Sequence, residues 1–156
     1  MNDRDEFTIS LASAKDAAAI AKLNLLFNEA TDPAEAIATR MSDPRCVETV
    51  ILAKVADEVV GFALVRVVPS VLYATPHAEL TELYVMDEYR QRGIASELIA
   101  FAEQVAAQKG ARSILVQTKR KCSPVNCKRL ANCSNTSLQV SKVKVKNRVS
   151  FIKRPT

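Results

Sequence analysis

The sequence is short of several residue types, and each shortage argues against a class of protein. Its single histidine, His77, argues against a histidine-rich metal site. No run of about 18 apolar residues is present, so no segment is expected to span a membrane. The first residues, MNDRDEF, are polar and acidic, which is unlike a secretory signal. We therefore expect a cytoplasmic setting in which the four cysteines remain free thiols.

Acidic residues are also missing from the last part of the chain. All 17 Asp and Glu lie in residues 1–118, together with 11 of the 22 Lys and Arg, whereas residues 119–156 carry the other 11 basic residues. The 156 residues, 48% of them apolar, suit one globular domain. We therefore divide the chain into an acidic domain, 1–118, and an atypical basic C-terminal segment, 119–156.

Hydrophobic patterning predicts the elements of the acidic domain. Alternating or β-branched runs predict strands, and apolar residues at helical spacing predict helices. Strands are expected over residues 7–13, 46–55, 59–68, 78–85 and 112–118, and helices over 13–30, 32–43 and 94–109. The helices carry apolar stripes formed by Ile20, Leu23 and Phe27 and by Ile94, Leu98, Phe101, Ala102 and Val105. The order β-α-α-β-β-β-α-β predicts an α/β or α+β layered fold, with helices packed on a mixed sheet.

The ends of these elements carry recognisable signals. Ser13 or Asp16 can cap the first helix, and Gly110 is placed to end the helix before it. Residues 56–58 separate two β-branched runs and predict a hairpin, which Pro69 ends.

The stretch YVMDEYRQRGIAS raises the question of which ligand the start of the helix at residue 94 binds. A helix N-terminus has unpaired N–H groups and a positive dipole end, and both favour anions. Gly93 permits close approach to the backbone, Ala95 adds little bulk, and Arg90 and Arg92 can fork onto phosphate oxygens. The stretch predicts a pyrophosphate cradle, and the alternative is an ordinary helix start with solvated arginines.

The longer run LTELYVMDEYRQRGIASELI resembles the central motif of the GNAT superfamily of N-acetyltransferases. Arg90, Gly93 and Ala95 stand at the three fixed positions of that motif, and the resemblance covers about residues 7–118. It implies a GNAT-like, mostly antiparallel sheet whose fourth and fifth strands splay around acetyl-CoA. It also implies that the pantetheine arm lies along Leu83, Tyr84 and Val85, and the pyrophosphate on the amides of Gln91, Arg92, Gly93, Ile94, Ala95 and Ser96.

Acetyl transfer to an amine needs a base for the amine proton. Glu82 is the leading candidate because it is nearest the acetyl end and matches an acidic position in similar enzymes, and Glu79 is the second. Regular alternation places the two on opposite faces of their strand. It groups Leu80 with Glu82 and Tyr84, and Glu79 with Thr81, Leu83 and Val85. The alternative is that Glu82 is a solvated residue, and His77 is expected in a loop rather than in catalysis.

The general acid cannot be assigned. In the family that the sequence resembles, a tyrosine follows the fifth strand within Asn-x-x-Ala-x-x-Leu/Phe-Tyr. Residues 119–156 contain neither tyrosine nor glycine, and Asn126, Leu130 and Ala131 do not reproduce the pattern.

Several interpretations of residues 119–156 compete. A shifted reading frame or a foreign ending explains the abrupt change in composition. A nucleic-acid-binding arm is disfavoured because Phe151 is the only aromatic residue there. A zinc site at Cys122, Cys127 and Cys133 is disfavoured by their spacing. The alternating stretch over residues 140–151 can pair as an edge strand.

The leading hypothesis is an N-acetyltransferase that moves the acetyl group of acetyl-CoA to a primary amine of a small molecule or protein by direct attack. The acidic domain favours a cationic amine. The alternatives are a non-catalytic acyl-CoA-binding domain and a nucleic-acid binder acting through its basic tail. No metal or membrane partner is expected, and a homodimer is left open.

Overall fold

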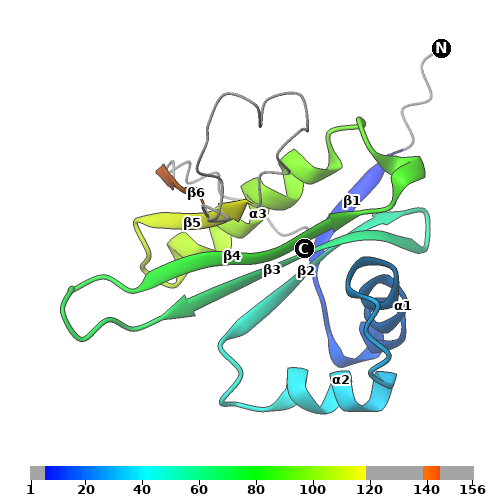
Figure 1. Cartoon of the computed structure of the whole chain (residues 1–156), viewed down its shortest axis with the longest axis horizontal. Helices are drawn as coiled ribbons and strands as arrows, with labels where there is room; N and C mark the ends of the chain where they lie inside the picture. Colours follow the sequence, from blue (N-terminus) through cyan, green and yellow to red (C-terminus); the bar gives the residue numbers. More distant parts are fainter. Residues whose placement is uncertain (1–5, 119–138, 145–156) are drawn as a thin grey trace, which may run out of the picture.

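A computed structural model of the chain describes residues 6–118 and 139–144 (Figure 1). The elements are β1 (Phe7–Leu11), the 3-10 turn η1 (Ala14–Asp16), α1 (Ala17–Asn28), α2 (Ala34–Ser42), β2 (Glu48–Val55), β3 (Glu58–Val68), β4 (His77–Val85), the 3-10 turn η2 (Asp87–Tyr89), α3 (Ile94–Gln108), β5 (Ser113–Thr118) and β6 (Gln139–Lys144). The predicted order of strands and helices is confirmed. His77 was expected in a loop, and that was wrong, because it is the first residue of β4.

The strands form one six-stranded sheet in chain order, β1-β2-β3-β4-β5-β6. All neighbours are antiparallel except β4 and β5, which are parallel and joined through α3. Helix α3 covers one face of the sheet, and α1 and α2 lie on the other (Figure 1). The predicted layered fold class, with a mostly antiparallel sheet, is therefore confirmed.

Each face of the sheet has its own apolar core. On the α3 face the fully buried side chains include Ile51, Val65 and Leu98. On the other face Leu23 of α1 packs with Leu52 and Phe62 of the sheet. Burying one such side chain stabilises the fold by about 1.5–3 kcal/mol, so both layers contribute substantially.

The predicted cap of the first helix is confirmed, although the first turn is a 3-10 turn. The carboxylate of Asp16 accepts hydrogen bonds from the backbone N–H of Ser13 at 2.8 Å and from its hydroxyl at 3.1 Å. Lys54 on β2 forms a salt bridge with the same carboxylate at 3.0 Å. The start of the helix is thereby tied to the sheet beneath it.

An irregularity in β4 overturns the alternation expected for that strand. Opposite β3, Leu64 pairs with Glu82 but Val65 pairs with Leu80, which leaves Thr81 as an extra residue in a β-bulge. A bulge residue reverses the faces of the positions that follow it. Leu80 therefore lies on the α3 face with Leu83 and Val85, and not with Glu82 and Tyr84 as predicted.

The same bulge places the two candidate bases on one face. Glu79 pairs with Arg66, which lies two residues from Leu64, the partner of Glu82, and cross-strand partners point to the same side of a sheet. Glu79 and Glu82 thus both face α1 and α2. The prediction that they face opposite sides was wrong because alternation along one strand cannot reveal a bulge.

Strands β4 and β5 diverge soon after they pair. Their pairing covers only Ala78–Leu80 and Ile114–Val116, whereas β4 continues to Val85. The splay that the resemblance implied is therefore present. Beyond it, β6 pairs antiparallel with β5 at the edge of the sheet. It begins one residue before the predicted edge-strand range 140–151 and otherwise lies inside that range.

The other predictions for the basic segment, including those for Cys122, Cys127, Cys133, Asn126 and Phe151, lie outside the described residues. In the part of the chain that is described, no helix is both long enough and apolar enough to cross a bilayer.

Candidate functional site

The connection from β4 to α3 is built around two left-handed backbone positions. The backbone N–H of Met86 bonds to the carbonyl of Val60 at 2.9 Å and fixes the end of β4, after which η2 makes one turn. Gln91 (φ 62°) and Gly93 (φ 85°) then reverse the chain, and α3 begins at Ile94, whose side chain is buried in the core. The helix therefore starts at a fixed position with its positive dipole end beside the end of β4.

A pocket of about 470 Å³ lies at this junction. Its lining residues are Phe27, Leu83, Tyr84, Val85, Tyr89, Arg90, Gln91, Gly93, Ile94, Ala95 and Ser96. Nine of the ten residues predicted to contact the cofactor, Arg90 included, are among them, and Arg92 is the exception. The residues predicted from one contiguous motif are thus brought together around one cavity.

Gly93 leaves open space where the helix begins. A Cβ atom built on Gly93 meets nothing within 4 Å, so the backbone there is accessible to a ligand. Its positive φ is one that residues with a side chain rarely adopt. Together these features suit the close approach of an anion to the backbone.

The two arginines fold back onto the connection rather than over the helix start. The Nε of Arg90 donates to the carbonyl of Val85 at 3.0 Å, and its terminal nitrogen forms a salt bridge with Asp87 at 2.7 Å. Arg92 donates to the carbonyl of Glu88 at 3.2 Å and lies over the ring of Tyr89. Arg90 thus stays at the pocket wall, whereas Arg92 stiffens the loop.

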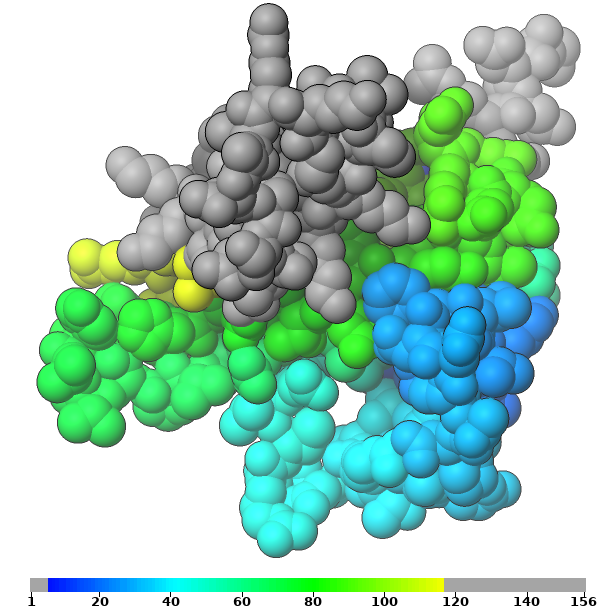
Figure 2. Space-filling view, in the orientation of Figure 1, coloured from blue at the N-terminus to red at the C-terminus, as the bar shows by residue number. Residues whose placement is uncertain are grey.

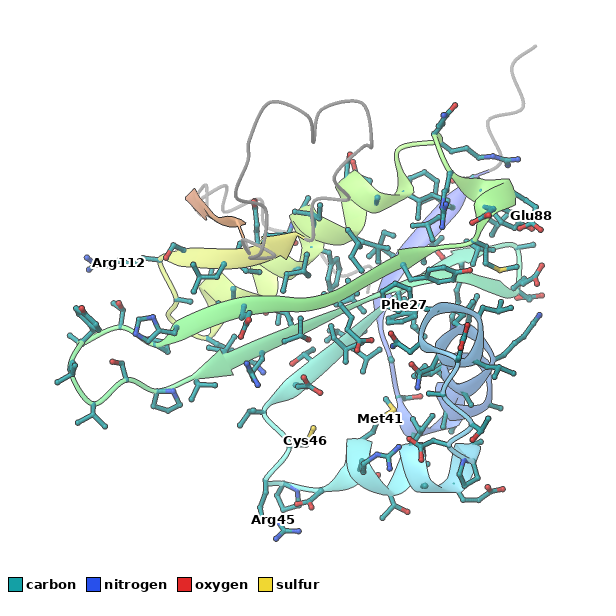
Figure 3. All side chains as sticks on the ribbon, viewed as in Figure 1. Phe27, Met41, Arg45, Cys46, Glu88 and Arg112 are labelled. Carbon is teal, nitrogen blue, oxygen red and sulfur yellow. The ribbon has the colours of Figure 1, made fainter. Side chains whose placement is uncertain are left out.

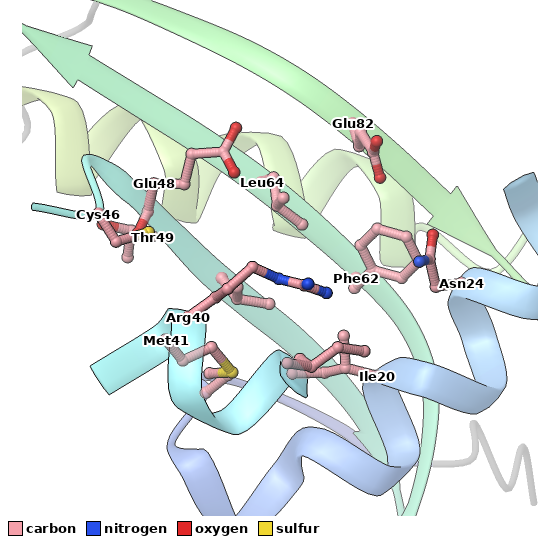
Figure 4. Close-up of a pocket in the computed structure, with 13 residues that line it drawn as sticks. Ile20, Asn24, Arg40, Met41, Cys46, Glu48, Thr49, Phe62, Leu64 and Glu82 are labelled. Atoms are coloured by element: carbon pink, nitrogen blue, oxygen red, sulfur yellow. The ribbon is translucent and has the colours of Figure 1, made fainter. Parts of the chain in front are cut away.

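A second pocket, of about 360 Å³, lies on the α1/α2 face of the sheet (Figure 4). It is lined by Ala12, Ile20, Asn24, Ile37, Arg40, Met41, Cys46, Glu48, Thr49, Val50, Phe62, Leu64 and Glu82. The space-filling view shows a hollow between α2 and the start of β2 (Figure 2), and Met41 and Cys46 lie on either side of it (Figure 3).

Glu82, the leading candidate base, lines this second pocket from the sheet side. Its side chain is half-buried and accepts a hydrogen bond from the amide of Asn28 at 3.3 Å, and Asn28 in turn donates to Asn24 at 2.8 Å. Burial raises the pKa of the Glu82 carboxyl, the hydrogen bond from Asn28 lowers it, and the charge of Glu48 raises it, with a net increase. A carboxylate with a raised pKa accepts a proton more readily near neutral pH.

Glu79, the second candidate base, has different surroundings. Its carboxylate forms a salt bridge with Arg66 on β3, and it lines neither of the two pockets. A carboxylate held by a guanidinium outside both pockets is not placed to meet a substrate bound in either of them.

Three aromatic side chains separate the two pockets. The ring of Phe27 lies 5.2 Å from that of Tyr84 and 6.0 Å from that of Phe62, between centroids. Phe27 and Tyr84 line the first pocket, and Phe62 lines the second. Phe27 was predicted as part of an apolar helix stripe, yet its side chain is 40% exposed. No sequence signal distinguished it from a core residue.

Comparison with known proteins agrees with this geometry. A family model described as "Acetyltransferase (GNAT) family" matches residues 15–125. No curated protein matches the sequence significantly.

Many solved structures share the fold. A ribosomal-protein-alanine N-acetyltransferase from Brucella melitensis is 20% identical with a TM-score of 0.62, over 70% of this chain and 78% of that one. An aminoglycoside acetyltransferase from an uncultured soil metagenomic sample is 20% identical with a TM-score of 0.66, over 75% and 82%. A GNAT-family acetyltransferase from Streptococcus pneumoniae is 18% identical with a TM-score of 0.59, over 73% and 75%. At these identities the likeness concerns the fold.

Proposed function

The chain belongs to the acetyltransferase (GNAT) family, and from that premise we propose that it transfers the acetyl group of acetyl-CoA to a primary amine. Residues 1–118 form the acetyl-CoA-binding domain in this proposal. The acceptor is a small molecule or a peptide, in line with the aminoglycoside and ribosomal-protein acetyltransferases among the structural neighbours. A cytoplasmic location fits the free, exposed thiol of Cys46.

We assign acetyl-CoA to the pocket at the end of β4. The pantetheine arm lies along Leu83–Val85, where β4 has no β5 neighbour. The pyrophosphate sits on the amides of Gln91–Ser96, at the positive end of α3. The open space at Gly93 is the observation that carries this assignment, because it lets phosphate oxygens reach the backbone without meeting a side chain.

The acceptor amine enters from the second pocket and meets the thioester near Tyr84. Its nitrogen attacks the acetyl carbonyl carbon, the bond from that carbon to sulfur breaks, and the sulfur leaves as a thiolate. Glu82 accepts the proton that the amine loses, directly or through a water molecule. A thiol has an ordinary pKa of about 8.5, so the departing thiolate takes a proton from water and needs no dedicated acid.

The raised pKa of Glu82 and the salt bridge of Glu79 support Glu82 as the base. The two residues provide a matched pair of variants. Glu82→Gln is expected to lower kcat by roughly 10²–10⁴-fold, the usual contribution of a general base. Glu79→Gln is expected to lower kcat by less than about tenfold, since in this proposal it moves no proton.

The measurement is release of the CoA thiol from acetyl-CoA over a panel of primary amines, with circular dichroism to show that each variant is folded. Equal activity of the parent and Glu82→Gln contradicts the role of Glu82. A chain that binds acetyl-CoA but acetylates no amine is instead the alternative, an acyl-CoA-binding domain without catalysis.

A further inference from the structure

The aromatic side chains that lie between the two pockets come from three different elements. Tyr84 on β4 pairs with Phe62 on β3, with 6.1 Å between their ring centroids, and both rings face α1 and α2. Phe27, in the last turn of α1, lies against both rings at the place where this helix approaches β4 (Figure 3). We call these three side chains the aromatic partition.

The three members of the aromatic partition are buried to different degrees. Phe62 is fully buried in the core beneath α1, and Tyr84 is half-buried on its strand. Phe27 is 40% exposed and belongs to the end of a helix rather than to the sheet. The ring of Phe27 can therefore be removed without opening the core, whereas that of Phe62 cannot.

The last turn of α1 is tied to the sheet beside the aromatic partition. The side-chain amide of Asn28 donates to Glu82 of β4 at 3.3 Å and to Asn24, one turn earlier in α1, at 2.8 Å. Glu29 then ends the helix in the left-handed region, with φ 56°. Phe27 is thus held at a defined position relative to β4, although its ring is partly exposed.

The aromatic partition lies where the two substrates of the proposed reaction have to meet. Phe27 and Tyr84 line the pocket assigned to acetyl-CoA, whereas Phe62 and Glu82 line the second pocket, from which the amine enters in the proposed function. Since the thioester carbonyl has to be reached from both pockets, the acyl group belongs beside the partition. A carbon chain longer than acetyl would then meet the ring of Phe27.

Apolar space that a longer acyl chain could occupy lies on the far side of the aromatic partition. The second pocket has a volume of about 360 Å³, and Ile20, Phe62 and Leu64 form part of its wall. Side chains in contact leave no gap as wide as a methylene chain, so the ring of Phe27 keeps this space apart from the first pocket. Replacing Phe27 by alanine removes the whole phenyl ring and joins the two spaces.

We propose that Phe27 limits the length of the acyl group that the chain accepts, so that acetyl-CoA is used in preference to CoA thioesters with longer alkyl chains. This inference rests on the proposed function and concerns its acyl donor. Phe27 is then a specificity-determining residue that moves no proton. One methylene too many in an apolar pocket changes kcat/KM by roughly 10–200-fold, which sets the scale of the preference.

The experiment measures kcat/KM of the full chain for acetyl-CoA, propionyl-CoA and hexanoyl-CoA, with the most active acceptor of the amine panel. The parent should use acetyl-CoA roughly 10–200-fold better than hexanoyl-CoA, with propionyl-CoA between them. In Phe27→Ala this ratio should fall by about tenfold or more, because the chain enters the space that the ring occupied. Phe27→Leu keeps most of the bulk and should keep most of the preference.

Leu26→Ala is the matched control. Leu26 precedes Phe27 in α1, is 52% exposed and lines neither pocket, so the ratio should equal that of the parent. A parent that uses hexanoyl-CoA as well as acetyl-CoA overturns the inference. An unchanged ratio in Phe27→Ala, shown to be folded by circular dichroism, also overturns it, as does an equal change in Leu26→Ala.

Failure of the proposed function is a different result, namely the absence of transfer from any thioester to any amine. Calorimetric titration with acetyl-CoA and with hexanoyl-CoA then decides the inference by itself. Tighter binding of acetyl-CoA by the parent, with a ratio of Kd values that shrinks by about tenfold or more in Phe27→Ala, supports it. Equal binding of the two thioesters by the parent, or no binding of either by a folded parent, overturns it.

Discussion

Replacing Gly93 by alanine tests whether the start of α3 holds the pyrophosphate. Alanine at φ 85° occupies the left-handed region, which costs about 1–2 kcal/mol, partly offset by a loss of freedom in the unfolded chain. The net loss is about 1 kcal/mol, or roughly 3 °C in Tm for a domain of this size. The added methyl meets nothing in the protein, so no larger loss of stability is expected.

The effect on acetyl-CoA should be much larger than the effect on stability. The methyl group occupies the open space at Gly93 where, in the proposed complex, phosphate oxygens approach the backbone. Displacing one charge-assisted hydrogen bond costs about 1.5–3 kcal/mol, which is roughly 10–150-fold in Kd. Calorimetric titration gives Kd, and thermal unfolding followed by circular dichroism gives the stability.

Gly110→Ala is the control. Gly110 lies at the opposite end of α3 with φ 88°, and a Cβ there is at an ordinary contact distance of 3.8 Å from Pro76. The two variants should lose similar stability, whereas only Gly93→Ala should lose affinity. Equal affinity in the two variants would refute the assignment of the cradle.

Stability measurements on four variants test the fold and its charges. Leu98→Ala removes a fully buried side chain of α3 and should lower the free energy of unfolding in urea by about 2–5 kcal/mol; Leu25→Ala, 49% exposed, should change it by less than about 1 kcal/mol. In Asp16, the hydrogen bond from Ser13 and then that from Lys54 lower the carboxyl pKa below 3.8. Asp16→Ala should therefore lower the free energy of unfolding by about 1 kcal/mol at neutral pH. The difference in stability between the parent and this variant should vanish as the pH falls below 3.8 and the carboxyl becomes protonated. Burial raises the pKa of the Glu82 carboxyl above 4.5. The parent should therefore lose stability as the pH rises through this raised pKa, because the buried carboxyl then becomes charged. Urea titrations at several pH values should show a smaller loss for Glu82→Gln, which has no carboxyl to ionise.

The grouping of residues around the pocket at the start of α3 could be predicted from the sequence because it is local. Residues 83–96 form one strand end, one connection and one helix start, and the anion preference of a helix N-terminus depends on nothing distant. The motif therefore predicted nine residues that line a single pocket. Arg92 was the exception, because its side chain found partners in η2 that a motif does not describe.

The second pocket could not be predicted in the same way, since it depends on contacts between distant segments. The bulge at Thr81 arises from the register of β3 on β4, and alternation within β4 alone placed Glu79 and Glu82 on opposite faces, whereas they share one. Phe27 lies at the helical spacing of a core residue, yet it lines the first pocket because α1 ends beside Tyr84. No local sequence pattern indicated that Glu48 lines the second pocket.

The most direct test of the central claim is calorimetric titration of the full chain with acetyl-CoA, beside an Arg90→Ala, Gly93→Asp double variant that is shown to be folded. The double variant removes the guanidinium at the pocket wall and places a carboxylate where the pyrophosphate is expected to lie. The account predicts binding at one site in the parent and its loss in the double variant. Equal binding by both proteins, or no binding by a folded parent, would contradict it.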